Sequence, residues 1–165
     1  MIVMKIDNIK GDCNIKEFKE YINLESCSWD IEREFKDSGK AGGSDINMGI
    51  GELVPLECAK VMDKSSVFLM HEAIAGGSLG VVEICYLATQ GLKDKPPEVY
   101  LHLKLDTAVI TGWNMSASGD DRPEETFKIW YKKIWMQYRS TVDGVNYKVE
   151  GDKGWDRVVA KPWKA

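Results

Sequence analysis

The sequence predicts a mainly β fold with a single flanking α-helix at about Ser66–Ala75. Apolar and polar residues alternate over much of the chain, most clearly in the run VYLHLKLD that begins at Val99, and this alternation places one face of a strand against a core. Helical spacing of apolar residues is convincing only in SSVFLMHEAIAGG, which two serines open and two glycines close.

The N-terminal part predicts two strands separated by a short polar segment. Apolar residues at positions 2, 4 and 6 indicate a first strand that ends within residues 8–11. Residues 13–21 are charged and too few for more than a loop or one helical turn. The run YINLESCSWDI is a second strand whose apolar residues change face, which predicts a bulge around Glu25 and Ser26.

A glycine-rich arm is predicted next. Ile46, Met48 and Ile50 alternate with Asn47 and two glycines, so one face of this strand carries almost no side chains and a neighbouring backbone can approach closely. We interpret residues 39–52 as an extended hairpin-like arm, without the pattern of a phosphate-binding loop. The following run LVPLECAKVMD continues as a strand, with its proline at an edge or at its beginning.

In the predicted helix, Ser65 or Ser66 is expected to accept hydrogen bonds from the first turn, and Gly76 to end the last turn in a left-handed conformation. Val67, Met70 and Ile74 share one face of this helix. A strand, GVVEICYLATQ, and a turn, GLKDKPP, then lead to Val99.

Two long extended runs dominate the C-terminal half. The first, from Val99 to Trp113, keeps one apolar parity throughout, with Val109, Thr111 and Trp113 on the face of the preceding leucines. The second, EETFKIWYKKIWMQY, changes parity at Lys132 and Lys133, which predicts a bulge in a bent strand. Because Trp130 and Trp135 make its second face apolar as well, the strand belongs to a closed barrel, to a sandwich, or to a sheet covered by another subunit.

Length and charge exclude several function classes. The 165 residues, 44% of them hydrophobic and 29% charged, suit one soluble domain spanning residues 1–165. A net charge of −4 without a Lys/Arg-rich run provides no field for a nucleic acid backbone. We identify no signal peptide and no apolar run of membrane-spanning length, so any export is expected to follow a route that reads no such signal.

No catalytic, cofactor or metal site is predicted. Four cysteines, at positions 13, 27, 58 and 85, lack metal-binding spacing and are interpreted as reduced structural thiols. His71 and His102 stand far apart without a third ligand. Serines near glycine lack a nucleophile elbow.

An acidic cluster and the six tryptophans are two further candidates for a functional site. Asp120, Asp121, Glu124 and Glu125 offer carboxylates for calcium or for glycoside hydrolysis, but DDRPEE is more typical of a solvated turn entering a strand. The six tryptophans are either a platform for sugar stacking or, as we prefer, the filling of a β core or a subunit interface.

Several motifs resemble, in order, the haemolysin-coregulated protein (Hcp) family of type VI secretion systems. These are MKIDNIKGD, KEYINLESCSWDI, MDKSSVFLMHEAIAGG, the long run YLHLKLDTAVITGWNMSASGDDRPEETFKIWYKKIWMQY, and the closing GWD. The similarity covers nearly the whole chain, whereas residues 32–57 and the tail KPWKA follow no family pattern.

The resemblance implies a single-domain β-barrel of two antiparallel sheets with the flanking helix. It also implies a structural role without catalysis: six copies join head to tail in a ring, and stacked rings form the tube that a contractile sheath drives outward. Implied partners are further copies of the chain, the sheath, tip and baseplate of the apparatus, and effector proteins in the ring interior. Such a protein is cytoplasmic before assembly and is then exported by the apparatus itself.

The residues that we expect at the subunit interface are Ile46, Met48 and Ile50 on the arm, and Trp130 and Trp135 on the two-sided strand. Two alternatives remain at this stage. One is a monomeric carbohydrate-binding β-sandwich that uses exposed tryptophans, and the other is a small secreted hydrolase that uses Asp120 or Asp121.

Overall fold

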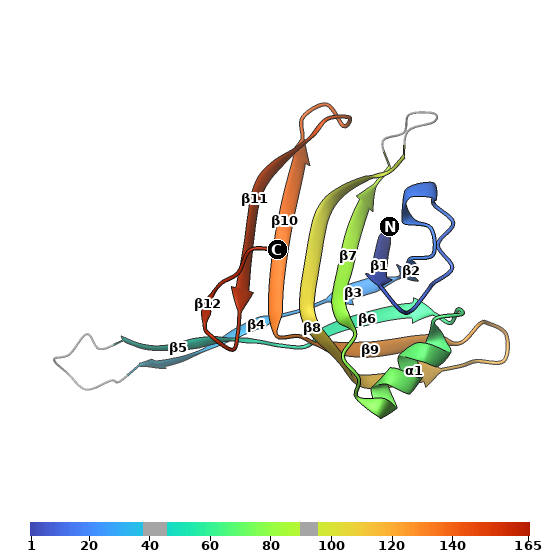
Figure 1. Cartoon of the computed structure of the whole chain (residues 1–165), viewed down its shortest axis with the longest axis horizontal. Helices are drawn as coiled ribbons and strands as arrows, with labels where there is room; N and C mark the ends of the chain where they lie inside the picture. The colour runs from blue at the N-terminus through green and yellow to red at the C-terminus, as the bar shows by residue number, and fades with distance from the viewer. Residues whose placement is uncertain (38–45, 90–95) are drawn as a thin grey trace.

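Figure 1 shows the computed structural model of the chain, in which residues 1–37, 46–89 and 96–165 are described. Strands dominate, and α1 lies at one side of the molecule while the hairpin β4–β5 projects from the other. In chain order the elements are β1 (Ile2–Ile6), the 3₁₀ turn η1 (Lys16–Phe18), β2 (Ile22–Leu24), β3 (Ser26–Ser28), β4 (Ile31–Asp37), β5 (Ile46–Leu53), β6 (Leu56–Val61), α1 (Ser66–Ala75), β7 (Gly80–Ala88), β8 (Glu98–Ser116), β9 (Glu124–Trp130), β10 (Lys133–Thr141), β11 (Tyr147–Asp156) and β12 (Lys161–Pro162).

Two antiparallel layers are joined at two corners. The first layer has the order β12-β11-β10-β8-β7-β1-β2, and the second contains β9, β6 and β3. Strand β8 forms one corner, because it pairs with β10 up to Asp106, with β7 up to Ala108, and with β9 from Val109 onward. The other corner is Glu25, which separates β2 on β1 from β3 on β6. The predicted mainly β fold with two sheets and one helix is confirmed, although β10–β12 extend the first layer beyond β8 instead of closing onto the second.

The corner in β8 changes which side chains are buried. Leu105 is buried before it and Ala108 after it, so the apolar parity shifts by one across Thr107, whose φ is 55°. The prediction of one unbroken parity is therefore wrong at Thr111, which is exposed. A second irregularity between Ile110 and Gly112 then returns the partly buried Trp113 to the core side.

The predicted bulge at Lys132 and Lys133 is instead a change of sheet. β9 ends at Trp130 in the second layer, β10 begins at Lys133 in the first, and the Lys132 N–H donates to the Asp106 carbonyl at 3.0 Å. β8 remains the neighbour on one side, from Val109 opposite Trp130 to Asp106 opposite Lys133, whereas the neighbour on the other side changes from β6 to β11.

The main core fills the space between the two layers. It is built from side chains of nearly every strand and from one residue of α1, Leu69. A smaller cluster lies on the opposite face of the first layer, where residues of the 9–21 segment cover Val3, Cys85 and Leu87. This second cluster explains why β1 and β7 are apolar on both faces.

The helix has the predicted bounds and the predicted glycine end. Gly76 has a φ of 70°, and its N–H donates to the Glu72 carbonyl at 2.9 Å. The serine capping prediction is wrong, because the side chain of Ser65 caps no helical N–H. The Ser66 hydroxyl does not cap the helix either. It accepts from the Asp63 N–H at 2.9 Å and belongs to the buried polar network described below.

Candidate functional site

An apolar groove lies where the base of the β4–β5 hairpin meets β10 and β11. It has a volume of about 400 Å³. Its walls come from three places: Trp29 and Ile31 before and at the start of β4, Leu53 at the end of β5, and side chains of the β10–β11 pair such as Ile134, Met136 and Trp155. Ile31 and Met136 are exposed, so the groove is open to a partner.

Two cations stand at this groove. Arg33 on β4 and Lys153 on β11 are among its lining residues. The surface is thus apolar at its centre with positive charges beside it, an arrangement typical of protein contact surfaces.

A second apolar surface is the outer face of α1. Val67, Phe68 and Ile74 are 63%, 56% and 78% exposed, while Ser66 and Leu69 are the buried residues of the helix. The face that the sequence pattern assembles from Val67, Met70 and Ile74 therefore points largely away from the core. Figure 1 places α1 and the β4–β5 hairpin on different sides of the molecule.

The two predicted interface tryptophans occupy different environments. Trp130 is partly buried and packs against Arg157, whose guanidinium carbon lies 4.9 Å from the ring centroid. Trp135 is only 7% exposed; its Nε1–H donates to Asp152 at 3.2 Å and its ring meets His102 edge to face at 5.6 Å. Trp29 and Trp155 line the groove instead, without having been singled out by the sequence pattern.

Of the arm predicted at residues 39–52, the part from residue 46 onward is strand β5, which forms a hairpin with β4. In its backbone register, Asp37 is opposite Ile46 and Phe35 is opposite Met48. The side chains of Ile46, Met48 and Ile50 lie outside the part of the chain that the structure describes, as do residues 38–45. The three residues thus lie on a strand of the projecting hairpin.

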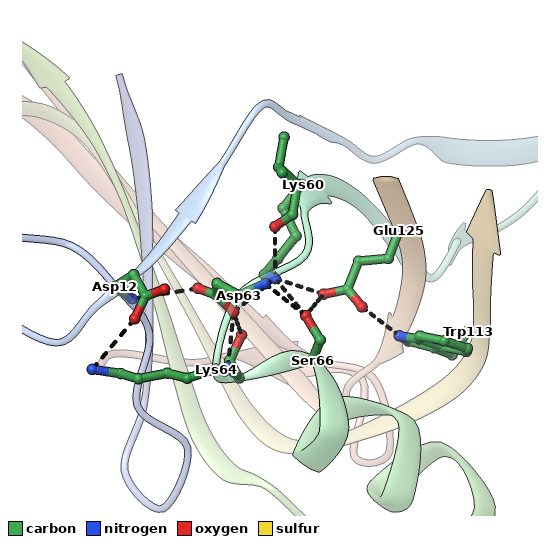
Figure 2. A network of polar contacts seen from close by, with 9 residues as sticks. Asp12, Lys60, Asp63, Lys64, Ser66, Trp113 and Glu125 are labelled. Atoms are coloured by element: carbon green, nitrogen blue, oxygen red, sulfur yellow. Dashed lines mark hydrogen bonds and ion pairs between the residues drawn. The ribbon is translucent and has the colours of Figure 1, made fainter. Parts of the chain in front are cut away.

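A buried polar network connects α1 to strands β6, β8 and β9, and Figure 2 shows it from close by. The Lys60 Nζ lies 2.6 Å from Glu125 Oε1 and 2.9 Å from Asp63 Oδ1, and it donates to Ser66 Oγ at 3.1 Å. Ser66 Oγ donates to Glu125 Oε1 at 2.9 Å, and the Trp113 indole N–H donates to Glu125 Oε2 at 2.9 Å. The side chains of Lys60 and Glu125 are fully buried.

Glu125 corrects the interpretation of the acidic cluster as a solvated turn. Asp120, Asp121 and Glu124 are exposed, as expected of such a turn, but Glu125 is inside the protein. The signal that could have identified it is strand parity, because Glu125 precedes the buried Phe127 and Ile129 at intervals of two. Glu125 is paired with Lys60 and is therefore not available to a site formed by the exposed carboxylates of this turn.

Asp63 holds the start of α1 on this network. Burial acts to raise its pKa, but hydrogen bonds from Ser65 and Lys60 outweigh burial, so the pKa of Asp63 is lowered from its ordinary value of 3.8. Its second oxygen accepts the Asp12 N–H at 3.3 Å, which ties the 9–21 segment to the same point. In the described residues no buried side-chain nitrogen or oxygen lacks a partner, so the network is fully hydrogen-bonded and positions α1.

The histidines stand in separate places. His71 is exposed on α1, and His102 contacts Glu83 at 3.0 Å across β7 and β8, a hydrogen bond that lowers the pKa of Glu83. Among residues 1–37, 46–89 and 96–165, no three His, Cys, Asp or Glu side chains gather as metal ligands would. No helix within those ranges is long and apolar enough to span a bilayer.

The family model described as "Type VI secretion system effector, Hcp" matches residues 3–138. The chain belongs to the Hcp family. It is thus a tube protein of type VI secretion, and the resemblance noted in the sequence is confirmed. No curated protein matches the sequence.

Solved Hcp structures share the fold. A structure described as a type six secretion system protein is 24% identical, with 98% of each chain covered and a TM-score of 0.86. Hcp1 from Salmonella typhimurium is 20% identical over 98% of this chain and 97% of its own, with a TM-score of 0.75. A type VI secretion system effector from Yersinia pestis is 20% identical over 94% and 99%, with a TM-score of 0.68.

Proposed function

We propose that six copies of this Hcp-family chain join head to tail in a ring, and that stacked rings form the tube of a type VI secretion apparatus. The role is structural and involves no catalysis. The observation that carries the proposal is the pair of unlike apolar surfaces on one subunit: the groove at the base of β4–β5 and the outer face of α1.

Unlike surfaces are what a head-to-tail assembly needs. An interface between two identical patches closes a dimer, whereas contact between two different patches continues to the next copy until a ring closes. The groove is concave with Arg33 and Lys153 beside it, and the helix face is convex with Glu72 beside it. Such a contact would bury Phe68 and Ile74, which are 56% and 78% exposed in the single chain.

The predicted interface residues remain part of the proposal. Ile46, Met48 and Ile50 lie on the projecting hairpin, which suits a strand that reaches a neighbouring copy. Trp130 is partly buried and can add its remaining area, while Trp135 at 7% exposure would act mainly by holding the β10–β11 wall of the groove in place.

The ring is tested by electron microscopy and light scattering of the purified protein. We expect rings with a central hole and the mass of six subunits. Phe68→Glu on α1, Met136→Glu in the groove and the double change Met48→Asp with Ile50→Asp should each give folded monomers. Val142→Glu is the matched control, because Val142 is fully exposed in the β10–β11 turn, away from both surfaces.

The outcomes separate two failures. Wild-type protein that stays monomeric at high concentration contradicts the ring. If all three variants still form rings, the proposal of a ring stands and the assignment of these surfaces to its interface is rejected. Unchanged circular dichroism of each variant shows that loss of assembly is not loss of folding.

Export and cargo complete the proposal. The subunit is made in the cytoplasm, leaves through the apparatus without a signal peptide, and holds effector proteins in the ring interior on the way. Its partners are the sheath, tip and baseplate, and neither nucleic acid nor membrane insertion is involved. Release into the medium that stops when the sheath is deleted is the expected result, and release that continues without the sheath would contradict it.

A further inference from the structure

Two cysteines face each other across the pair of strands β3 and β6. Cys27 is directly opposite Cys58 in an unbroken antiparallel register, with Ser26 opposite Ala59 and Ser28 opposite Glu57 on either side. Directly opposite residues have Cα atoms about 4.5–5.5 Å apart and side chains on the same face of the sheet. That separation lies within the range of about 4.4–6.8 Å found in disulfides. Both cysteines are free thiols in the structure.

The two thiols differ in exposure and in acidity. Cys58 is fully buried in the main core, whereas Cys27 is partly exposed and packs against that core. A hydrogen bond from Cys58 lowers the pKa of the Cys27 thiol; burial opposes this, and a hydrogen bond from Tyr86 lowers the pKa further. The bond to Cys27, together with burial, raises the pKa of Cys58 well above its ordinary value. Cys27 is thus the thiol of this pair that solvent reaches and that ionises first.

The other two cysteines lack this arrangement. Cys85 on β7 is opposite Val3 and His102, and burial raises its pKa to about 11. Cys13 is buried in the small cluster outside the strands. Both therefore serve as internal references for a thiol that is buried without a facing cysteine.

We propose that Cys27 and Cys58 are an oxidisable pair that forms a disulfide when the folded protein meets an oxidising pool of small disulfides. The Cys27 thiolate attacks one sulfur of oxidised glutathione, which gives a mixed disulfide and releases one glutathione. The Cys58 sulfur loses its proton to solvent and attacks the Cys27 sulfur, which forms the Cys27–Cys58 bond and releases the second glutathione. The pair is oxidised by two electrons, and the oxidant is reduced to two thiols.

The first step prepares the second. While Cys27 is ionised, the hydrogen bond that it accepts from Cys58 keeps the proton on Cys58. Once the Cys27 sulfur is bonded to glutathione it carries no charge, so this cause of the raised pKa of Cys58 is removed. The buried Cys58 needs no access to the oxidant, because its target sulfur is then the one directly opposite.

The position of the bond gives it a consequence. The chain leaves Cys27, runs out along β4, returns along β5 and reaches Cys58. A disulfide would therefore fasten together the two strands at the root of the projecting hairpin, next to Trp29, Ile31 and Leu53 of the groove. The inference does not rest on the ring, since the two cysteines lie within one chain.

The test is oxidation of the folded protein with oxidised glutathione, followed by blocking of free thiols in denaturant and mass analysis. We expect wild-type protein to lose the mass of two hydrogen atoms, to yield one linked peptide that contains Cys27 and Cys58, and to keep Cys13 and Cys85 free. The urea midpoint of the oxidised protein should exceed that of the reduced protein, and dithiothreitol should reverse both changes.

Variants resolve the order of the two steps. Cys58→Ser should stop at a glutathione adduct on Cys27, Cys27→Ser should leave Cys58 unmodified, and Cys85→Ser should form the bond as wild type does. If Cys58→Ser does not fold, Cys58→Ala replaces it. The inference is overturned if Cys27 and Cys58 stay free in folded, oxidised wild type, or if linkage occurs equally through Cys13 or Cys85.

Discussion

Replacement of Lys60 by methionine should destabilise the protein more than any surface ion-pair substitution. The change keeps an unbranched side chain of similar length and removes the positive charge that lies 2.6 Å from Glu125 and 2.9 Å from Asp63. At 2.6 Å and an effective dielectric constant of about 20, the attraction between two unit charges is about 6 kcal/mol before desolvation is subtracted. Removing one partner of a buried pair leaves the other charge uncompensated and costs about 3–5 kcal/mol.

The assay is urea unfolding followed by circular dichroism, at one protomer concentration because self-association adds to apparent stability. With a slope of about 2 kcal/mol per molar urea, the Lys60→Met midpoint should fall by roughly 2 M. Lys128→Met is the matched control: Lys128 lies 3.5 Å from Glu57 with both side chains more than half exposed, and the loss of such a pair costs about 0–1 kcal/mol.

A second substitution tests the cause. Adding Glu125→Gln to Lys60→Met removes the buried one of the two carboxylate charges that have lost Lys60, the other being Asp63. Because the new amide keeps an oxygen that accepts from Ser66 or from Trp113, the second change should restore part of the lost stability. The reasoning is refuted if Lys60→Met costs no more than Lys128→Met, or if Glu125→Gln destabilises the Lys60→Met protein further.

Three smaller predictions use the same unfolding assay. Gly154→Ala should cost about 1–3 kcal/mol, because the added Cβ would lie 2.6 Å from the Trp163 carbonyl oxygen and 2.7 Å from that of Ile134; equal stability would show that β12 yields freely. Thr107→Gly should raise the free energy of unfolding by up to about 1 kcal/mol, because it relieves a φ of 55° in a β-branched residue at the cost of some chain entropy. A lower free energy of unfolding would show that Thr107 is not strained. Asp63→Asn should destabilise at neutral pH and less so in acid. The lowered pKa of Asp63 contributes stability that is complete above 3.8 and is lost as pH falls through the folded-state pKa, so a difference that does not shrink below 3.8 would contradict this assignment.

The sequence predicted local structure well where the determinants are local. The C-terminal bound of α1 follows from Gly76, whose left-handed φ of 70° a residue with a side chain rarely adopts. The first strand and the short helical turn at Lys16–Phe18 could be predicted from the sequence in the same way.

The sequence pattern marks the positions of two corners of the fold, but the prediction of a bulge at each was wrong. A change of parity at Glu25 or at Lys132 signals that the chain shifts by one residue relative to its surroundings, and a bulge is the local explanation. The structure shows that the surroundings themselves change: β2 pairs with β1 and β3 with β6, while β9 and β10 share β8 on one side but have β6 and β11 on the other. One sequence contains no information on which distant strand lies beside it, so a bulge and a change of sheet have the same pattern.

The same limit explains why the buried network was missed although both of its charges carried a signal. Lys60 follows the buried Leu56 and Cys58 at intervals of two, and Glu125 precedes Phe127 in the same way, so each occupies a core position of its strand. Taken alone, either residue resembles a polar interruption of an apolar face. Only the register of β6 on β9, which puts Lys60 directly opposite Glu125, turns two unfavourable burials into one compensated pair. A charged residue at a core position of a strand therefore predicts an opposite charge on the strand beside it, and that expectation can help to choose among strand pairings before a structure is known.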